Sequence, residues 1–179
     1  MDHNELSIKI YDAAFALQKL CIERGLKVAT AESLTGGMIS SSIVDIPGSS
    51  AYFDRGFAVY NNTAKREMLG VHKDIFEKFT EVSGQCVEAM AKGAIEHSYA
   101  NVSCAVSGVA GPDGGSEQNP VGTVWMAVAA MTAPCSCTLN VYSKRFLFSG
   151  DRKSVRMQTT LQALLMMSYL IKGELGGKA

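Results

Sequence analysis

Apolar residues along this chain alternate between two spacings, every third or fourth position and every second position. Over residues 6–23 the spacing is helical, and Arg24 and Gly25 mark the end of that helix. A short β-prone run follows at 27–31, and helical spacing returns at 38–44. The chain therefore opens as helix, strand, tight turn and helix.

The remainder of the chain repeats these two spacings. Runs rich in β-branched, aromatic or apolar residues predict strands at 52–60, 102–107, 121–130 and 138–148. Helical spacing predicts helices at 62–70, 72–79, 82–97 and 152–170. A turn at 132–137 should join the last two strands in antiparallel fashion, and residues 173–179 should fray. A chain of 179 residues, 1–179, fits a single α/β domain.

Composition argues against two classes of partner. Lys plus Arg and Asp plus Glu both total 17, so no net charge attracts the molecule to nucleic acid or to an acidic membrane surface. The N-terminus lacks a signal-peptide pattern, and no apolar run reaches the ~18 residues of a membrane span. We therefore expect neither nucleic acid nor a membrane as a partner.

Cysteine usage favours a reducing compartment. The five cysteines are an odd number, and only Cys135 and Cys137 lie close together, without a second Cys or His cluster to complete a zinc site. Cys104 lies within an apolar run and should be buried as a free thiol. We expect a cytoplasmic protein without a metal centre.

The turn after the first strand carries the strongest candidate chemistry. Ser33 lies between the strand and the next helix, and Thr35, Gly36 and Gly37 follow it. A side chain at such an elbow lies beside a helix N-terminus, whose free N–H groups could receive the negative charge that forms when a hydroxyl attacks a carbonyl. Ser33 is thus a candidate nucleophile. The alternative is that Ser33 or Thr35 merely caps the helix.

Lys65 is the candidate base. Asn62 or Thr63 should cap the helix that Gly70 closes, which places Lys65 in the first turn, where the helix dipole disfavours a cation. Partial desolvation there would lower the pKa of the amine toward that of a useful general base. The alternative is an ordinary solvated lysine on the surface.

Three more segments are candidate ligand contacts. The glycine-rich loop 108–120 could cradle a phosphate with its N–H groups or be a flexible hairpin connection, and it matches neither nucleotide-binding glycine fingerprint. The loop 45–50 could hold an anion or simply turn the chain. Arg152 should open the last helix and bind a carboxylate or phosphate, unless it pairs with Asp151 or Asp54.

The turns that carry Ser33, Lys65 and the glycine-rich loop each follow a predicted strand. If the first three strands run parallel in one sheet, these turns meet at its carboxyl edge, where open α/β sheets bind ligands. Such convergence would combine three weak signals into one candidate site.

Six segments together carry a resemblance to a known family: TAESLTGG at 30–37, PGSSAYF at 47–53, YNNTAK at 60–65, SGVAGPDGG at 107–115, PVGTVW at 120–125 and SGDR at 149–152. Through them, essentially the whole chain closely resembles the CinA C-terminal domain family. The resemblance implies a three-layer α/β/α sandwich with a mixed central sheet. It also implies subunits that pair as homodimers or larger homo-oligomers.

The resemblance further implies an activity. The family includes stand-alone nicotinamide-nucleotide amidohydrolases, which cleave the carboxamide of nicotinamide mononucleotide to give nicotinic acid mononucleotide and ammonia in pyridine nucleotide (NAD) recycling. Ser33 would then be the nucleophile and Lys65 the base, with no metal and no cofactor. The residues implied to shape the substrate pocket are Thr35, Gly36, Ser50, Tyr60, Ser107, Gly108 and Arg152.

Two positions depart from the family pattern. Leu34 stands where many relatives have Cys, and Gly84 stands where an acidic residue is frequent. The presence of both Ser33 and Lys65 favours an active enzyme. Two alternatives stay open: a Ser–Lys amidase with another substrate, and a nucleotide-binding or competence-related module without catalysis.

Overall fold

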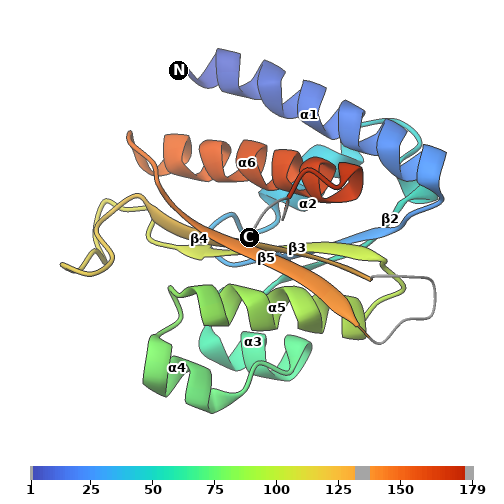
Figure 1. Ribbon diagram of the computed structural model, residues 1–179. Helices are drawn as coiled ribbons and strands as arrows, with labels where there is room; N and C mark the ends of the chain where they lie inside the picture. The colour runs from blue at the N-terminus through green and yellow to red at the C-terminus, as the bar shows by residue number, and fades with distance from the viewer. Residues whose placement is uncertain (1, 132–137, 176–179) are drawn as a thin grey trace.

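The computed structural model describes residues 2–131 and 138–175, and it has three layers with a mixed five-stranded sheet in the middle (Figure 1). The strand order is β2-β1-β3-β4-β5. The strands are β1 (Val28–Glu32), β2 (Phe53–Ala58), β3 (Val102–Gly108), β4 (Thr123–Met131) and β5 (Leu139–Leu147). The expected fold class is confirmed, whereas the turn expected at 132–137 lies outside the described residues.

Helices cover both faces of the sheet (Figure 1). One face carries α1 (His3–Arg24), α2 (Met38–Val44) and α6 (Arg152–Lys172). The other face carries α3 (Asn62–Leu69), α4 (Lys73–Phe79) and α5 (Gly84–Glu96), and a short 3-10 turn, η1 (Ser49–Ala51), precedes β2. No helix in the described part of the chain is long and apolar enough to cross a membrane.

Alternation along the strands builds two different cores. One face of the sheet presents valines to α1, α2 and α6, namely Val28, Val102, Val106, Val124 and Val128. The opposite face presents alanines to α5, namely Ala29, Ala31, Ala105, Ala127 and Ala129. Because successive strand residues point to opposite faces, a one-residue slip would exchange the two sets, and this fixes the register of the strands.

Parallel pairing brings three strand ends to one edge of the sheet. β1 runs parallel to both β2 and β3, and Glu32 at its end is in register with Ala58 and Val106. The turns that follow these three strands therefore lie side by side, as expected. The loop 45–50 precedes β2 and lies at the other edge, because Phe53 is in register with Val28 at the start of β1.

The helix ends follow local chemistry with one shift from expectation. Asn61 caps α3, with its side-chain oxygen accepting the Ala64 N–H at 2.7 Å, in place of the expected Asn62 or Thr63. Gly70 ends the same helix in the left-handed conformation, as glycine does most readily. Lys65 consequently lies at the end of the first turn of α3, close to its expected place.

Candidate active site

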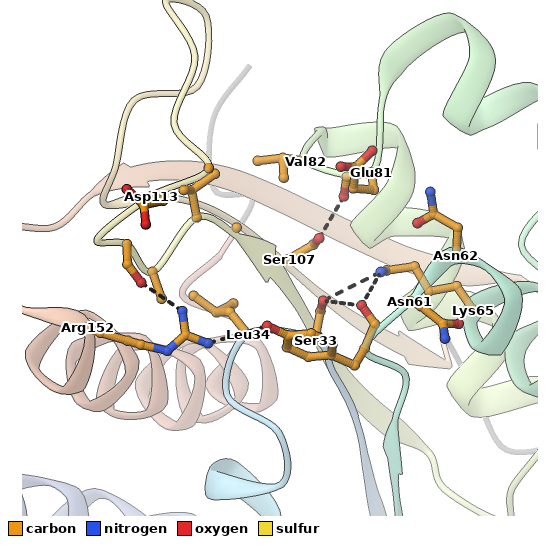
Figure 2. Close-up of a pocket in the computed structure, with 16 residues that line it drawn as sticks. Ser33, Leu34, Asn61, Asn62, Lys65, Glu81, Val82, Ser107, Asp113 and Arg152 are labelled. Atoms are coloured by element: carbon orange, nitrogen blue, oxygen red, sulfur yellow. Dashed lines mark hydrogen bonds between the residues drawn. The ribbon is translucent and has the colours of Figure 1, made fainter.

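A pocket of about 400 Å³ opens at the carboxyl edge of the sheet (Figure 2). The turns after β1, β2 and β3 and the first residue of α6 line it, and its volume lies in the range of small-molecule sites. Six of the site residues expected from the sequence line this pocket together: Ser33, Tyr60, Lys65, Ser107, Gly108 and Arg152.

Ser33 and Lys65 lie next to each other in this pocket (Figure 2). Lys65 Nζ is 3.5 Å from Ser33 Oγ, and both groups donate to the backbone carbonyl of Tyr60 at 3.4 Å. These distances are at the long end for hydrogen bonds, as is common for catalytic groups in the absence of a ligand. The arrangement allows the amine to take the hydroxyl proton when the hydroxyl attacks a substrate.

Lys65 is buried, with 1% of its surface exposed, which excludes the alternative of a solvated surface lysine. Burial lowers the pKa of its amine, because desolvation disfavours the charged form, and this effect outweighs the opposing influence of Cys86, Glu81 and Tyr60. No carboxylate in the described part of the chain lies within ion-pair distance of Lys65. The structure thus lacks the partner that would hold the amine in its charged form.

The cap of α2 differs from expectation. Gly37 occupies the cap position, and the buried carboxylate of Glu32 accepts the backbone N–H groups of Gly37, Ile39 and Ser40 at 2.8–3.0 Å. Neither Ser33 nor Thr35 caps the helix, so the alternative of a purely capping serine is wrong. The sequence predicted that the first N–H groups of α2 would be free to receive an oxyanion. That prediction is wrong for the N–H groups of Gly37, Ile39 and Ser40, which donate to Glu32.

Arg152 enters the pocket from α6, on the side of Ser33 away from Lys65 (Figure 2). Its guanidinium donates to the Gly111 carbonyl at 2.8 Å and to the Tyr60 hydroxyl at 3.3 Å. Asp151 instead caps α6, and Asp54 pairs with Arg55 at 2.7 Å. Since neither aspartate neutralises Arg152, its charge can meet an anionic group of a ligand.

The glycine-rich segment forms the pocket wall opposite the elbow. Gly108 ends β3, where an added Cβ would lie 2.4 Å from the Thr123 carbonyl oxygen, so only glycine fits there. The Ser107 hydroxyl donates to the Glu81 carbonyl at 2.6 Å and ties this wall to the segment before α5. The loop is thus both a connection between antiparallel strands and a lining of the site.

Three expected pocket residues do not line it. Thr35 is fully buried, and Thr35 and Gly36 lie behind Ser33 in the turn rather than in the pocket wall. Ser50 lies in η1, beside the opposite edge of the sheet, and is exposed. A single chain therefore does not bring Ser50 to Ser33, because η1 precedes β2 instead of following it.

Sequence reasoning missed several residues that shape the site. Glu81, Asn61 and Asn62 line the pocket, while Glu32 and Arg156 hold the elbow from outside it. Glu32 had a local signal, because a carboxylate five residues before the cap residue of a helix can accept the free N–H groups at the helix start. Arg156 had none, since its contact partners are about 120 residues away in the sequence.

Two further features concern metals and departures from the family pattern. No group of three or more His, Cys, Asp and Glu side chains that could hold a metal ion occurs within residues 2–131 and 138–175.

Gly84 lies under the Trp125 ring, where an added Cβ would be 3.0 Å from the nearest ring carbon. The glycine at this position therefore makes room for the indole.

Comparison with known proteins places these features in a family. The model of the CinA C-terminal domain matches residues 11–171. Two relatives named nicotinamide-nucleotide amidohydrolase PncC are similar to this chain. The one from Enterobacter agglomerans is 45% identical over 161 residues, which cover 90% of each chain. The one from Escherichia coli (strain K12) is 47% identical over 141 residues, which cover 79% of this chain and 82% of its own.

A solved structure gives the same result for the fold. The competence/damage inducible protein CihA from Agrobacterium tumefaciens superimposes with a TM-score of 0.85 at 39% identity, covering 92% of this chain and 96% of its own. The family match extends over most of the chain and includes the elbow, the α3 turn and the start of α6. This chain belongs to the CinA C-terminal domain family.

Proposed function

We propose that this protein is a nicotinamide-nucleotide amidohydrolase, which hydrolyses nicotinamide mononucleotide to nicotinic acid mononucleotide and ammonia. Two relatives that bear this name match the chain at 45% and 47% identity over most of its length. The observation that carries the proposal is the pair of Ser33 and buried Lys65 at 3.5 Å in one pocket.

The pair can perform both halves of the hydrolysis. Ser33 Oγ attacks the carboxamide carbon while Lys65 Nζ takes the hydroxyl proton, and the resulting ammonium protonates the amide nitrogen as the C–N bond breaks. Ammonia leaves, and the nicotinoyl group stays as an ester on Ser33. Water then attacks the ester carbon and gives a proton to Lys65. The bond from that carbon to Ser33 Oγ breaks as Lys65 returns the proton to Oγ, and nicotinic acid mononucleotide leaves. The Tyr60 carbonyl, 3.4 Å from both groups, holds the ammonium that forms between these steps.

Arg152 is the proposed phosphate contact. Its charge lies in the pocket without a carboxylate partner within the described residues, and a guanidinium matches phosphate oxygens well. Replacing Arg152 by Gln should raise KM for nicotinamide mononucleotide by ~10–100-fold and leave KM for nicotinamide riboside, which lacks the phosphate, unchanged. The neighbouring exposed residue offers a matched control, Lys153→Gln, which should change neither constant.

The direct test of the function is ammonia release from nicotinamide mononucleotide by the purified protein, with the nucleotide product identified by mass spectrometry. Ser33→Ala should lower kcat by at least ~10³-fold, because it removes the hydroxyl that lies next to Lys65 Nζ. Ser7→Ala, the same substitution on exposed α1, should leave kcat unchanged. Ammonia release that is equal in the wild type and Ser33→Ala would reject the proposal.

The two alternatives make different predictions in the same assay. An amidase with another substrate would show a Ser33-dependent reaction with non-nucleotide amides that is faster than with nicotinamide mononucleotide. A binding module would bind the nucleotide with no turnover, and Lys65→Ala would leave that affinity intact. The buried, uncompensated amine of Lys65 favours the enzyme, since burial of a cation without a partner costs stability and gives nothing to binding alone.

We also propose that the chain pairs as a homodimer in a reducing, cytoplasmic compartment. Four large apolar side chains of α1 are 42–64% exposed, namely Ile8, Tyr11, Phe15 and Ile22, and a partner subunit would cover them. Cys21, Cys86 and Cys104 are buried free thiols, which suits a reducing environment. Light scattering of the purified protein would measure the mass, and a monomer at micromolar concentration would reject the pairing.

A further inference from the structure

The turn that carries Ser33 holds almost all its backbone N–H groups in internal hydrogen bonds. Ser33 N–H donates to the Val106 carbonyl at 3.1 Å, and Gly36 N–H donates to the Ser33 carbonyl at 3.1 Å. Met38 N–H donates to the Thr35 carbonyl at 3.3 Å. Three more N–H groups, those of Gly37, Ile39 and Ser40, end on the Glu32 carboxylate.

Two N–H groups of residues 33–40 make no hydrogen bond within the described residues: those of Leu34 and Thr35. This follows from the geometry of a β-turn from Ser33 to Gly36, whose two central N–H groups are not used by the turn itself. Of the two residues, only Leu34 lines the pocket with Ser33. Leu34 is 4% exposed, and backbone N–H groups of buried residues rarely lack a partner, so this donor is available to an acceptor that enters the pocket.

We infer that the backbone N–H of Leu34 is the elbow's oxyanion donor, and that Glu32 and Arg156 are positioning residues that hold it there. The N–H of the residue after a nucleophile lies close to the carbonyl oxygen of the substrate under attack, and strand–turn–helix nucleophile elbows in other folds use the same donor. The inference rests on Ser33 as the proposed nucleophile, but it does not depend on the identity of the substrate.

Glu32 holds the helix side of the elbow. The residue is 1% exposed, and besides three N–H groups its carboxylate accepts the Ser40 hydroxyl at 2.7 Å. The residue directly precedes Ser33, so its side chain fixes α2 relative to the end of β1 and thereby fixes the turn between them. It also occupies the donors of α2, which would otherwise compete with Leu34 for the developing negative charge.

Arg156 holds the turn from the other side. Its Nε donates to the Leu34 carbonyl at 3.0 Å, and Nη2 donates to the Thr35 carbonyl at 2.7 Å. Two bonds from one planar guanidinium fix the orientation of two successive peptide planes, and a peptide plane cannot turn one end without the other. These two planes carry the N–H groups of Thr35 and Gly36, and the Gly36 N–H donates to the Ser33 carbonyl, which shares its peptide plane with the Leu34 N–H. Arg156 thus holds the plane of the elbow's donor indirectly, through Gly36.

The assignment gives a physical reason for the tolerance of Leu34 where many relatives have Cys. The Leu34 side chain is 4% exposed and belongs to the core on the α1 and α6 side of the sheet. The backbone N–H of Leu34, and not its side chain, is the group that interacts with the negative charge of the oxyanion. The chemistry therefore places few demands on the side-chain type at this position.

The sharpest test replaces the amide that carries the Leu34 N–H by an ester, through incorporation of the α-hydroxy analogue of leucine at position 34. The reference is a chain made by the same route with leucine. With nicotinamide mononucleotide, kcat should fall by ~10²–10³-fold while KM stays within ~3-fold, because the donor acts only on the oxyanion. A kcat within ~3-fold of the reference would overturn the assignment.

Two side-chain variants test the positioning role. Glu32→Gln and Arg156→Met should each lower kcat by ~10–100-fold at temperatures where circular dichroism shows a fully folded chain, with little change in KM. Glu88→Gln is the matched control for the glutamate, since Glu88 is half-buried in α5 and accepts a single hydroxyl bond, from Ser143. If the two variants had lower melting temperatures but an unchanged kcat, Glu32 and Arg156 would have a structural role only, and the positioning role would be rejected.

A substrate-independent measurement separates this inference from the proposed function. With p-nitrophenyl acetate, Ser33 Oγ attacks the ester carbonyl, nitrophenolate leaves, and mass spectrometry detects the acetyl group on Ser33. Slower acetylation in the position-34 ester chain would support the Leu34 assignment even if the wild type released no ammonia from nicotinamide mononucleotide, and that result would reject only the proposed substrate. Equal acetylation of Ser33 in both chains would overturn the assignment.

Discussion

At the scale of single residues, the site depends on an amine that is kept out of water. Lys65 lies in the first turn of α3, where the helix dipole disfavours a cation, and its side chain is 1% exposed. Both effects favour the neutral amine, which is the form that can accept a proton from Ser33. The same environment makes this residue a source of instability, because any protonated fraction is a buried charge without a carboxylate partner among residues 2–131 and 138–175.

The first prediction concerns the pH dependence of the reaction. Because burial lowers the Lys65 pKa, kcat/KM should rise with pH and level off at a lower pH than the ~10.4 of an ordinary lysine would give. The rise reports loss of the proton from the free enzyme's base. Lys65→Arg, which stays charged, should show almost no activity at any pH. Initial rates between about pH 6 and pH 10 would measure this, and a rate independent of pH across that interval would contradict the role of Lys65.

The second prediction concerns the stability cost of the same residue. Its folded-state pKa is below its unfolded value, so between these two values the unfolded chain binds more protons and the free energy of unfolding increases with pH. The cost is therefore full below the folded-state pKa and disappears above the unfolded value. Lys65→Met should raise the free energy of unfolding at neutral pH by ~0.5–2 kcal/mol while abolishing activity.

Urea denaturation at neutral pH and at about pH 10 would check this prediction. The stabilisation of Lys65→Met relative to the wild type should be smaller at the higher pH, because about pH 10 approaches the ~10.4 of the unfolded chain, above which the cost disappears. An equally large gain at both values would assign it to packing and not to the charge.

At the scale of elements, the elbow is held by a polar cluster between β1, β2 and α2. Thr30 on β1 and Ser40 on α2 are 2.6 Å apart through their hydroxyl oxygens, and Ser40 also donates to Glu32. Gly56 on β2 is in register with Thr30 and faces this cluster. A Cβ at position 56 would lie 2.2 Å from the Ser40 hydroxyl, so the absence of a side chain there makes room for the cluster.

The third prediction is therefore that Gly56→Ala displaces Ser40 and loosens the elbow. The free energy of unfolding should fall by ~1–3 kcal/mol, as in other overpacked sites, and kcat should fall with it. In the double variant Gly56→Ala/Ser40→Ala the nearest clashing atom is gone, so the double variant should lose less stability than the sum of the two single variants. Additive losses measured by urea denaturation would contradict the contact.

At the scale of the whole molecule, one sheet joins every functional segment. The Ser33 turn, the α3 lysine, the glycine-rich wall and the start of α6 belong to different elements, and each is anchored on the same five strands. Both helix layers contribute to the pocket, since Lys65 comes from one face and Arg152 from the other. The site therefore needs the complete sandwich, and we propose that residues 1–179 form a single domain.

The fourth prediction follows from this dependence. The only tryptophan, Trp125 on β4, packs on the start of α5 and reports the tertiary contact between sheet and helix. Thermal unfolding followed by Trp125 fluorescence and by far-ultraviolet circular dichroism should give midpoints within about 1–2 °C of each other. Two separated transitions would indicate independent units and contradict the single domain.

The sequence alone predicted most of the secondary structure and several residues of the candidate site, because both depend on local chemistry. Hydrophobic spacing predicted each helix and strand to within a few residues, because burial of one face imposes a period of 3.6 or 2. The position of each turn directly after a strand, together with the family motifs, also singled out Ser33, Lys65 and Arg152. These features depend on neighbours in the chain, which the sequence displays directly.

Only the tertiary structure decided which of these residues meet and which backbone groups stay free. Ser50 belongs to a conspicuous loop, yet that loop precedes its strand and therefore lies at the far edge of the sheet. Arg156 reaches the Leu34 and Thr35 carbonyls across more than 100 residues, and no local pattern signals that contact. Glu32 takes the helix donors that Ser33 was expected to use. Hydrogen bonds are saturable and depend on direction, so their final partners follow from the packed arrangement in three dimensions.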